Sequence, residues 1–122
     1  MARILVIDDS ALMRNILRGA LAEEGHETDA FLPESEAGLI EKLRNYAPDL
    51  LITDFNMPIL DGKAVVRICR FVVPAAKIVL LTASREPARD ALLQTMGVRR
   101  ILYKPIKAED VVSAVKEVLH VG

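Results

Sequence analysis

Chemically active side chains follow the apolar runs of this sequence at the points where those runs stop. Residues 4–7, 50–53, 77–81 and 101–103 end, in order, on Asp8 and Asp9, on Asp54, on Thr82 and on Lys104. If these runs are neighbouring parallel strands, their carboxyl ends bring three carboxylates, one hydroxyl and one ammonium group to one edge of a sheet. That edge is where open α/β sheets bind their ligands.

Clustered carboxylates need a counter-charge. Two carboxylates about 5 Å apart repel by roughly 3 kcal/mol at an effective dielectric constant near 20, so Asp8, Asp9 and Asp54 together favour cation binding. An all-oxygen ligand set in an open site is typical of Mg²⁺. Such a metal would shield an incoming phosphoryl group and let a carboxylate attack phosphorus, while Lys104 and Thr82 serve the remaining phosphoryl oxygens. The set predicts phosphoryl transfer onto Asp54.

The elements that must position these residues alternate between strand and helix. Residues 50–53 lack polar/apolar alternation and suit a strand covered on both faces, whereas residues 26–31 are more polar and suit a strand at or near the sheet edge. Helices are expected from Ser10 to Gly25, from Pro33 to Pro48, over 62–72, from Pro87 to Gly97 and over 108–119. Five strand-then-helix units predict an α/β fold, a doubly wound parallel sheet in a three-layer sandwich.

Apolar spacing within each helix predicts its inward face. The inward residues expected are Leu12, Met13, Ile16, Leu17, Ala20 and Leu21 in the first helix; Ala37, Ile40 and Leu43 in the second; Ala88, Ala91, Leu92 and Met96 in the fourth; and Val111, Val112, Val115 and Val118 in the last. Pro58 and the pair Asp61-Gly62 predict a loop over 55–61 beside Asp54.

Length and composition bound the function. The 122 residues fit one domain over 1–122, and a net charge of −1 gives no general attraction to nucleic acid or acidic membrane. Cys69 is the only cysteine, which excludes an internal disulfide and favours a core residue in a reducing cytoplasm. No apolar run approaches the roughly 18 residues of a membrane span. Arg85, Arg89, Arg99 and Arg100 fit either a solvated helix face or a docking patch for an acidic partner.

Several separate motifs resemble the receiver domain of two-component response regulators, in that family's order and over nearly the whole chain. They are residues 4–10 (ILVIDDS), residues 53–58 (TDFNMP) with Asp61-Gly62, Leu81-Thr82-Ala83, and Lys104-Pro105. The resemblance implies a flavodoxin-like five-stranded fold with a cis Lys104–Pro105 bond. It also implies a cytoplasmic signalling switch that catalyses only its own phosphorylation and dephosphorylation.

The same resemblance assigns roles to single residues. Asp54 is implied as the phospho-acceptor from a sensor histidine kinase or phosphotransfer protein. Mg²⁺ would be bound by Asp9, Asp54 and the backbone carbonyl of Asn56, with Asp8 assisting through water. Thr82 would be the switch hydroxyl, and Lys104 would pair with the phosphoryl group. A downstream protein would bind the face formed by the fourth helix, fifth strand and fifth helix.

The sequence departs from the family at positions that, in the family, link the phosphorylation site to the output face. Ile101 stands three residues before Lys104, where Tyr or Phe is usual, Ile106 replaces a usual Phe, and Lys107 replaces a usual helix cap. We therefore expect intact phosphorylation chemistry but weaker transmission to the output face. Tyr103, on the same side of the strand as Ile101, is the residue that could take over the aromatic role. With no effector domain in these residues, a stand-alone regulator or phosphorelay shuttle is expected, unless the chain is a domain excised from a longer protein.

Three other functions share parts of this pattern. An aspartate-nucleophile phosphatase for small molecules would need a second Asp at position 56, where the sequence has Asn, and a cap over the site. A flavin or nucleotide binder would need a phosphate loop rich in Gly, Ser or Thr after the first strand, where Asp8-Asp9-Ser10 stand. A scaffold that binds partners independently of phosphorylation would not need Asp54, Thr82 and Lys104.

Overall fold

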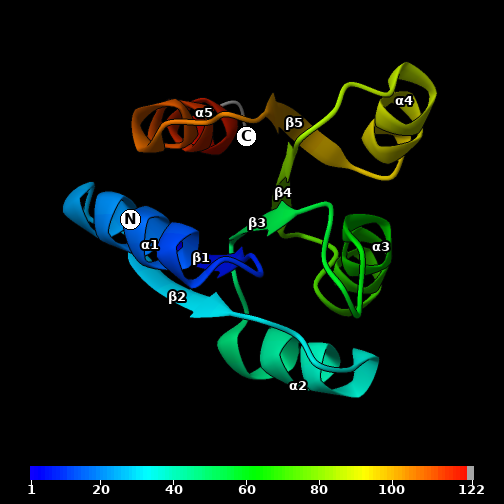
Figure 1. Cartoon of the computed structure of the whole chain (residues 1–122). Helices are drawn as coiled ribbons and strands as arrows, with labels where there is room; N and C mark the ends of the chain where they lie inside the picture. The colour runs from blue at the N-terminus through cyan, green and yellow to red at the C-terminus, as the bar shows by residue number, and fades with distance from the viewer. Residues whose placement is uncertain (121–122) are drawn as a thin grey trace.

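Five parallel strands and five helices alternate along the chain in the computed structural model, which describes residues 1–120 (Figure 1). The sheet has the order β2-β1-β3-β4-β5, so the chain winds in both directions from β1. The elements are β1 (Arg3–Ile7), α1 (Ala11–Glu23), β2 (Glu27–Phe31), α2 (Glu36–Tyr46), β3 (Leu50–Asp54), α3 (Gly62–Val72), β4 (Lys77–Thr82), α4 (Pro87–Thr95), β5 (Val98–Tyr103) and α5 (Ala108–His120). The predicted doubly wound α/β sandwich is confirmed, with β2 at the sheet edge as expected.

Helices cover both faces of the sheet. Leu17 and Leu21 of α1 and Val115 of α5 pack in one apolar cluster with Ile4, Val6 and Ile52 of the strands. Helices α2, α3 and α4 contribute to the other cluster, which takes the alternate strand residues, among them Leu5, Leu51 and Ile78. Because alternate residues of β1, β3 and β4 enter opposite clusters, these strands are apolar throughout and show no alternation in the sequence. No helix within residues 1–120 has the length and apolar character needed to cross a membrane.

Polar side chains cap three of the helices. The side chains of Ser10, Ser35 and Asp61 accept hydrogen bonds from the backbone N–H groups at the starts of α1, α2 and α3. The expected start of α2 at Pro33 is wrong, because Ser35 caps that helix and Glu36 is its first residue. The expected range of α3, residues 62–72, is confirmed.

Two predicted helix faces need correction. In α1, Leu17 and Leu21 are buried, but Leu12 is 71% and Ile16 44% exposed, because only one stripe of α1 meets the sheet and α5. In α4 the buried residues are Asp90 and Leu93, whereas Leu92 is 45% exposed and Ala88 and Ala91 are also exposed. Apolar spacing misplaced the inward face of α4 because one of its buried residues is an aspartate.

The other two helix faces follow the sequence more closely. In α2, Leu43 is buried as expected, but Leu39 is the second buried residue, Ile40 is half-buried and Ala37 is exposed. In α5, Val111, Val115 and Val118 are buried and Val112 is half-buried. Cys69 is a buried core residue, as predicted, and burial raises the pKa of its thiol to about 11.

Candidate functional site at the carboxyl edge of the sheet

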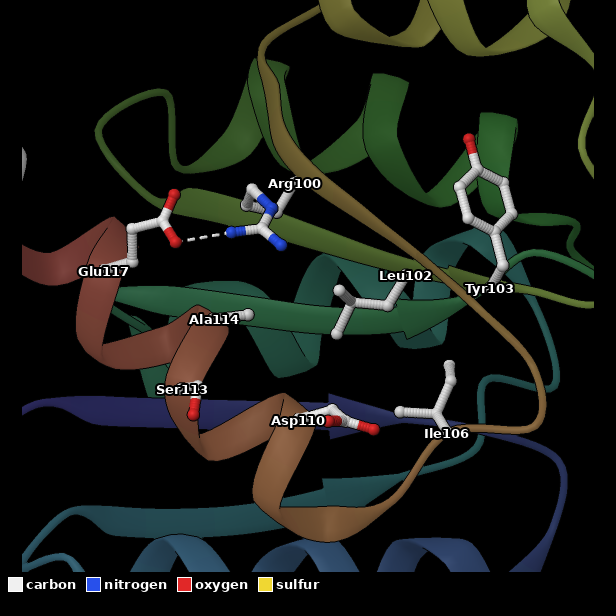
Figure 2. A pocket seen from close by; sticks show the side chains of 8 residues that line it. All are labelled: Arg100, Leu102, Tyr103, Ile106, Asp110, Ser113, Ala114 and Glu117. Carbon is white, nitrogen blue, oxygen red and sulfur yellow. Dashed lines mark hydrogen bonds and ion pairs between the residues drawn. The ribbon is translucent and has the colours of Figure 1, made fainter.

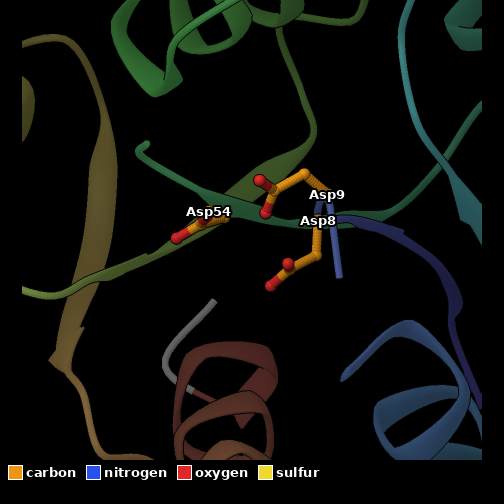
Figure 3. Close-up of side chains that lie close together, drawn as sticks. All are labelled: Asp8, Asp9 and Asp54. Carbon is orange, nitrogen blue, oxygen red and sulfur yellow. The ribbon is translucent and has the colours of Figure 1, made fainter. Parts of the chain in front are cut away.

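The carboxyl ends of β1 and β3 bring three acidic side chains together (Figure 3). One carboxylate oxygen from each of Asp8, Asp9 and Asp54 lies within 4.8 Å of the other two. The backbone explains this arrangement, because β1 and β3 are adjacent and pair in parallel as far as Ile7 and Thr53, the residues just before the acids. The cluster expected from the sequence is therefore present.

Two members of this cluster are removed from solvent. Asp8 is 1% and Asp54 2% exposed, whereas Asp9 is exposed. Burial raises the pKa of Asp8, and the hydrogen bond from the Ser10 backbone N–H opposes this shift. The negative charges of Asp54 and, to a smaller extent, Asp9 raise the pKa further, whereas the positive charge of Lys104 lowers it. A buried carboxylate next to two others is costly unless a cation joins them.

Two buried carboxylate oxygens of the cluster have no hydrogen bond and are therefore candidate ligands for a cation. Within residues 1–120, the buried side-chain oxygens or nitrogens without a hydrogen-bond partner are Asp8 Oδ2 and Asp54 Oδ1. Buried polar atoms normally have hydrogen-bond partners, so two such carboxylate oxygens in one acidic cluster, of which Asp54 Oδ1 has an ion pair with Lys104, fit the ligand set of a cation. Hard oxygen ligands fit Mg²⁺, and the residues present are compatible with that ion.

Lys104 supplies a positive charge directly at Asp54. Its Nζ lies 3.0 Å from Asp54 Oδ1, although the angles of this ion pair are not those of a hydrogen bond. The lysine follows β5 and precedes a cis peptide bond to Pro105, as the resemblance implied. Its backbone N–H donates to the Thr82 carbonyl at 2.7 Å, which fixes the start of this turn against β4.

Thr82 ends β4, next to Leu81, the register partner of Asp54. The threonine is fully buried, and its Oγ1 accepts a hydrogen bond from Arg89 Nη2 at 3.3 Å. The same guanidinium group lies over the ring of Phe55, 4.3 Å from the ring centre. Sequence reasoning placed Thr82 at this edge but placed Arg89 only in a general basic patch.

Asn56 lies exposed in the loop that follows Asp54. Two backbone hydrogen bonds fix the beginning of this loop: Phe55 N–H donates to the Leu81 carbonyl at 2.8 Å, and Gly62 N–H donates to the Phe55 carbonyl at 2.7 Å. The expected loop over 55–61 is confirmed, and its first residues are held against β4 and the start of α3.

A family model described as the response regulator receiver domain matches residues 4–116 of the chain. The chain belongs to this family. Its match begins in β1 and ends within α5, so it includes every residue of the acidic cluster together with Thr82 and Lys104. The suspected resemblance to receivers of two-component systems is thus confirmed.

Individual relatives agree with this assignment. The chain is 29% identical over 118 residues to the chemotaxis protein CheY of Bacillus subtilis, with 97% of this chain and 98% of that protein covered. It is 31% identical over 120 residues to the virulence transcriptional regulatory protein PhoP of Salmonella typhimurium, covering 98% of this chain but 52% of PhoP. Among solved structures, Vibrio cholerae CheY4 superposes with a TM-score of 0.85 at 25% identity, over 97% of this chain and 98% of that one.

The receiver's face formed by α4, β5 and α5 has a hollow of about 280 Å³ between β5 and α5 (Figure 2). Arg100 and Glu117 form an ion pair at one end of it, at 2.5 Å. The ring of Tyr103 extends away from Ile106 and Asp110 of this hollow. Of the four arginines noted in the sequence, Arg100 and Arg89 are thus paired with acids, and Arg85 and Arg89 lie over the aromatic rings of Tyr103 and Phe55.

Proposed function

We propose that this receiver is a phospho-accepting signalling switch in which Asp54 takes a phosphoryl group from a histidine kinase or phosphotransfer protein. The observation that carries the proposal is the pairing of a buried Asp54 with Lys104 at 3.0 Å, inside a cluster of three carboxylates. A structural aspartate in a turn would not need two neighbouring acids and an ammonium group. The match to the receiver family supports the same function.

In the proposed transfer, a carboxylate oxygen of Asp54 forms a bond to phosphorus on the side opposite the donor. The bond from phosphorus to the donor atom breaks, and its electron pair stays with the donor. Lys104 Nζ, already beside Asp54 Oδ1, stabilises negative charge on the phosphoryl oxygens. The Thr82 hydroxyl, one residue beyond the register partner of Asp54, donates to another phosphoryl oxygen.

Mg²⁺ would be held by Asp8, Asp9 and Asp54, with the Asn56 carbonyl as a further ligand. When bound, it would neutralise charge on the acids and on the incoming phosphoryl group. The buried oxygens of Asp8 and Asp54 that have no hydrogen bond support this assignment. We infer that the receiver catalyses only its own phosphorylation and dephosphorylation, and that phosphorylation alters binding of a downstream protein at the α4–β5–α5 face.

Intact mass after incubation with Mg²⁺ and acetyl phosphate tests this function. We expect a gain of one phosphoryl group in the wild-type protein, and no gain in the Asp54→Asn variant or when the metal is chelated. An unmodified wild type would contradict the proposal and favour a scaffold that works without phosphorylation. Modification that persists in Asp54→Asn would place the acceptor elsewhere.

A further inference from the structure

A continuous series of polar contacts leads from the phosphorylation site to the outer side of β5. Arg89 Nη2 donates to Thr82 Oγ1 at 3.3 Å and to Asp90 Oδ1 at 2.9 Å. The other carboxylate oxygen of Asp90 accepts a hydrogen bond from the Tyr103 hydroxyl at 2.5 Å. Two side chains, Arg89 and Asp90, therefore connect the Thr82 hydroxyl with a tyrosine at the end of β5.

The strand register favours Tyr103 over Ile101 as the partner of Thr82. On position along the strand alone, Tyr103 is the weaker candidate for an aromatic role, because it lies two residues nearer the loop. In the sheet, however, Tyr103 is the register partner of Thr82, while Ile101 is the partner of Leu80. Ile101 packs against the apolar cluster and has no polar atom that could respond to the Thr82 hydroxyl.

We propose that Tyr103 is the output-side switch residue of this receiver, and that Arg89 and Asp90 couple it to the Thr82 hydroxyl. This inference rests on the proposed function, since it concerns what phosphorylation of Asp54 does next. The expectation of weak transmission gave Tyr103 only a secondary role beside Ile101, and this proposal gives Tyr103 the main one.

The coupling follows because the Thr82 hydroxyl and the Arg89 guanidinium group can form only a limited number of hydrogen bonds at one time. Phosphorylation adds about one negative charge and new acceptor oxygens beside Thr82. The Thr82 hydroxyl has a single proton, so turning it toward the phosphoryl group changes the geometry of the 3.3 Å contact from Arg89. The guanidinium group, which already lies over Phe55, is drawn toward the added charge and away from Asp90. Asp90 then binds Tyr103 without its former cationic partner, and the tyrosine ring changes environment.

A second arginine provides a matched control. Arg85 lies over the Tyr103 ring with its guanidinium carbon 4.0 Å from the ring centre, but Thr82 accepts its side-chain hydrogen bond from Arg89. Removing Arg85 changes the surroundings of the ring without breaking the connection to Thr82. Removing Arg89 breaks that connection and leaves the contact between Arg85 and the ring intact.

The test uses the two tyrosines of the chain, labelled in the ring and observed by NMR. Tyr46, whose hydroxyl lies 3.3 Å from the Ile4 and Glu27 carbonyls, is the internal reference. With Mg²⁺ and beryllofluoride, a phosphoryl mimic, we expect the Tyr103 ring signals to shift in the wild type and in Arg85→Met. In Arg89→Met we expect loss of that shift, while fluorine NMR still reports bound beryllofluoride.

Asp90→Asn provides a second variant that does not depend on how Arg89→Met folds. Asn keeps an oxygen for the Tyr103 hydroxyl but lacks the charge that holds Arg89, so the shift should again be lost. A Tyr103 shift of wild-type size in either variant, or an unshifted Tyr103 in wild type with beryllofluoride bound, overturns the inference. Absence of the bound fluorine signal from wild type instead contradicts the proposed function, and this inference with it.

Discussion

Lys104 Nζ lies 3.0 Å from Asp54 Oδ1, and this is the one ion pair within residues 1–120 that reaches the acidic cluster. Asp54 is buried, whereas the lysine side chain is 33% exposed. The ammonium group therefore approaches Asp54, the proposed phospho-acceptor, from the solvent side, where a phosphoryl donor would also arrive. One positive charge against three carboxylates leaves the cluster two charges short of neutrality.

Replacing Lys104 should slow phosphorylation of the protein. For Lys104→Met we expect phosphorylation by acetyl phosphate to slow about 10- to 100-fold, the equivalent of a lost hydrogen bond to a charged group of about 1.5 to 3 kcal/mol. A time course of intact mass measures the rate. Lys107→Met, an exposed lysine three residues further along, is the control and should react at the wild-type rate. Equal slowing in both variants would mean that general surface charge, and not the contact with Asp54, attracts the donor.

Mg²⁺ binding should depend more strongly on Asp9, the implied direct ligand, than on Asp8, which is implied to assist through water. Calorimetric titration without any phosphoryl donor should show strongly weakened Mg²⁺ binding in Asp9→Ala and less weakened binding in Asp8→Ala.

Without metal, Asp8→Asn should raise the free energy of unfolding by about 1 to 3 kcal/mol, since it removes repulsion between close carboxylates. Glu23→Gln, at the opposite end of α1, should change neither the Mg²⁺ affinity nor the free energy of unfolding. Unimpaired Mg²⁺ binding in both alanine variants would remove the metal site.

The acidic cluster could be predicted from the sequence because strand ends control its geometry. Asp8 and Asp9 follow β1 and Asp54 ends β3, both strands are buried on both faces, and parallel neighbours place such residues at one edge. No side-chain conformation is needed for that inference. The same holds for Thr82, which ends β4, and for Lys104, which follows β5.

The contacts around Arg89 could not be predicted in this way. They depend on the rotation of α4, which apolar spacing misplaced because Asp90 is buried and Ala88 and Ala91 are not. A buried carboxylate looks like a surface residue in a sequence unless its partners are known. The register of β4 with β5 is equally hidden, since it shifts by an irregularity between Ile78 and Val79.

Asp90 should stabilise the fold in a pH-dependent manner. Burial acts to raise its pKa, but hydrogen bonds from Tyr103 and Arg89 outweigh burial and hold the pKa below the ordinary value of 3.8. A lowered folded-state pKa means stabilisation that is present above the ordinary value and lost as pH falls through the folded-state pKa. Asp90→Asn should therefore lower the free energy of unfolding near neutral pH by about 1 to 3 kcal/mol, and the difference should shrink below pH 3.8.

Urea unfolding of both proteins across this pH range measures the difference. Glu86→Gln is the matched control, because Glu86 pairs with the same arginine at 2.8 Å but its side chain is 57% exposed. Exposed ion pairs contribute about 1 kcal/mol or less, so this change should be small at every pH. A loss in Asp90→Asn that is constant with pH would show that packing, and not the carboxylate charge, accounts for it.

Gly62 should be the glycine at which an added methyl group disturbs the site. A Cβ atom there would lie 2.7 Å from the Cα of Phe55, the residue that follows Asp54, and 3.1 Å from Leu80 Cδ1. Because the nearest atom belongs to the backbone, the loop after Asp54 would have to move. Gly62→Ala should lower the free energy of unfolding by about 1 to 3 kcal/mol, the usual cost of overpacking, and should slow phosphorylation by acetyl phosphate.

Gly19→Ala separates this packing effect from the general effect of replacing glycine in a helix. Gly19 lies within α1, and a Cβ there would meet nothing within 4 Å. Alanine is the better helix former, so Gly19→Ala should raise the free energy of unfolding by up to about 1 kcal/mol and leave the phosphorylation rate unchanged. Urea unfolding and intact mass measure both quantities. If Gly62→Ala is as stable and as reactive as Gly19→Ala, the close approach of α3 to Phe55 does not position Asp54, and the loop tolerates displacement.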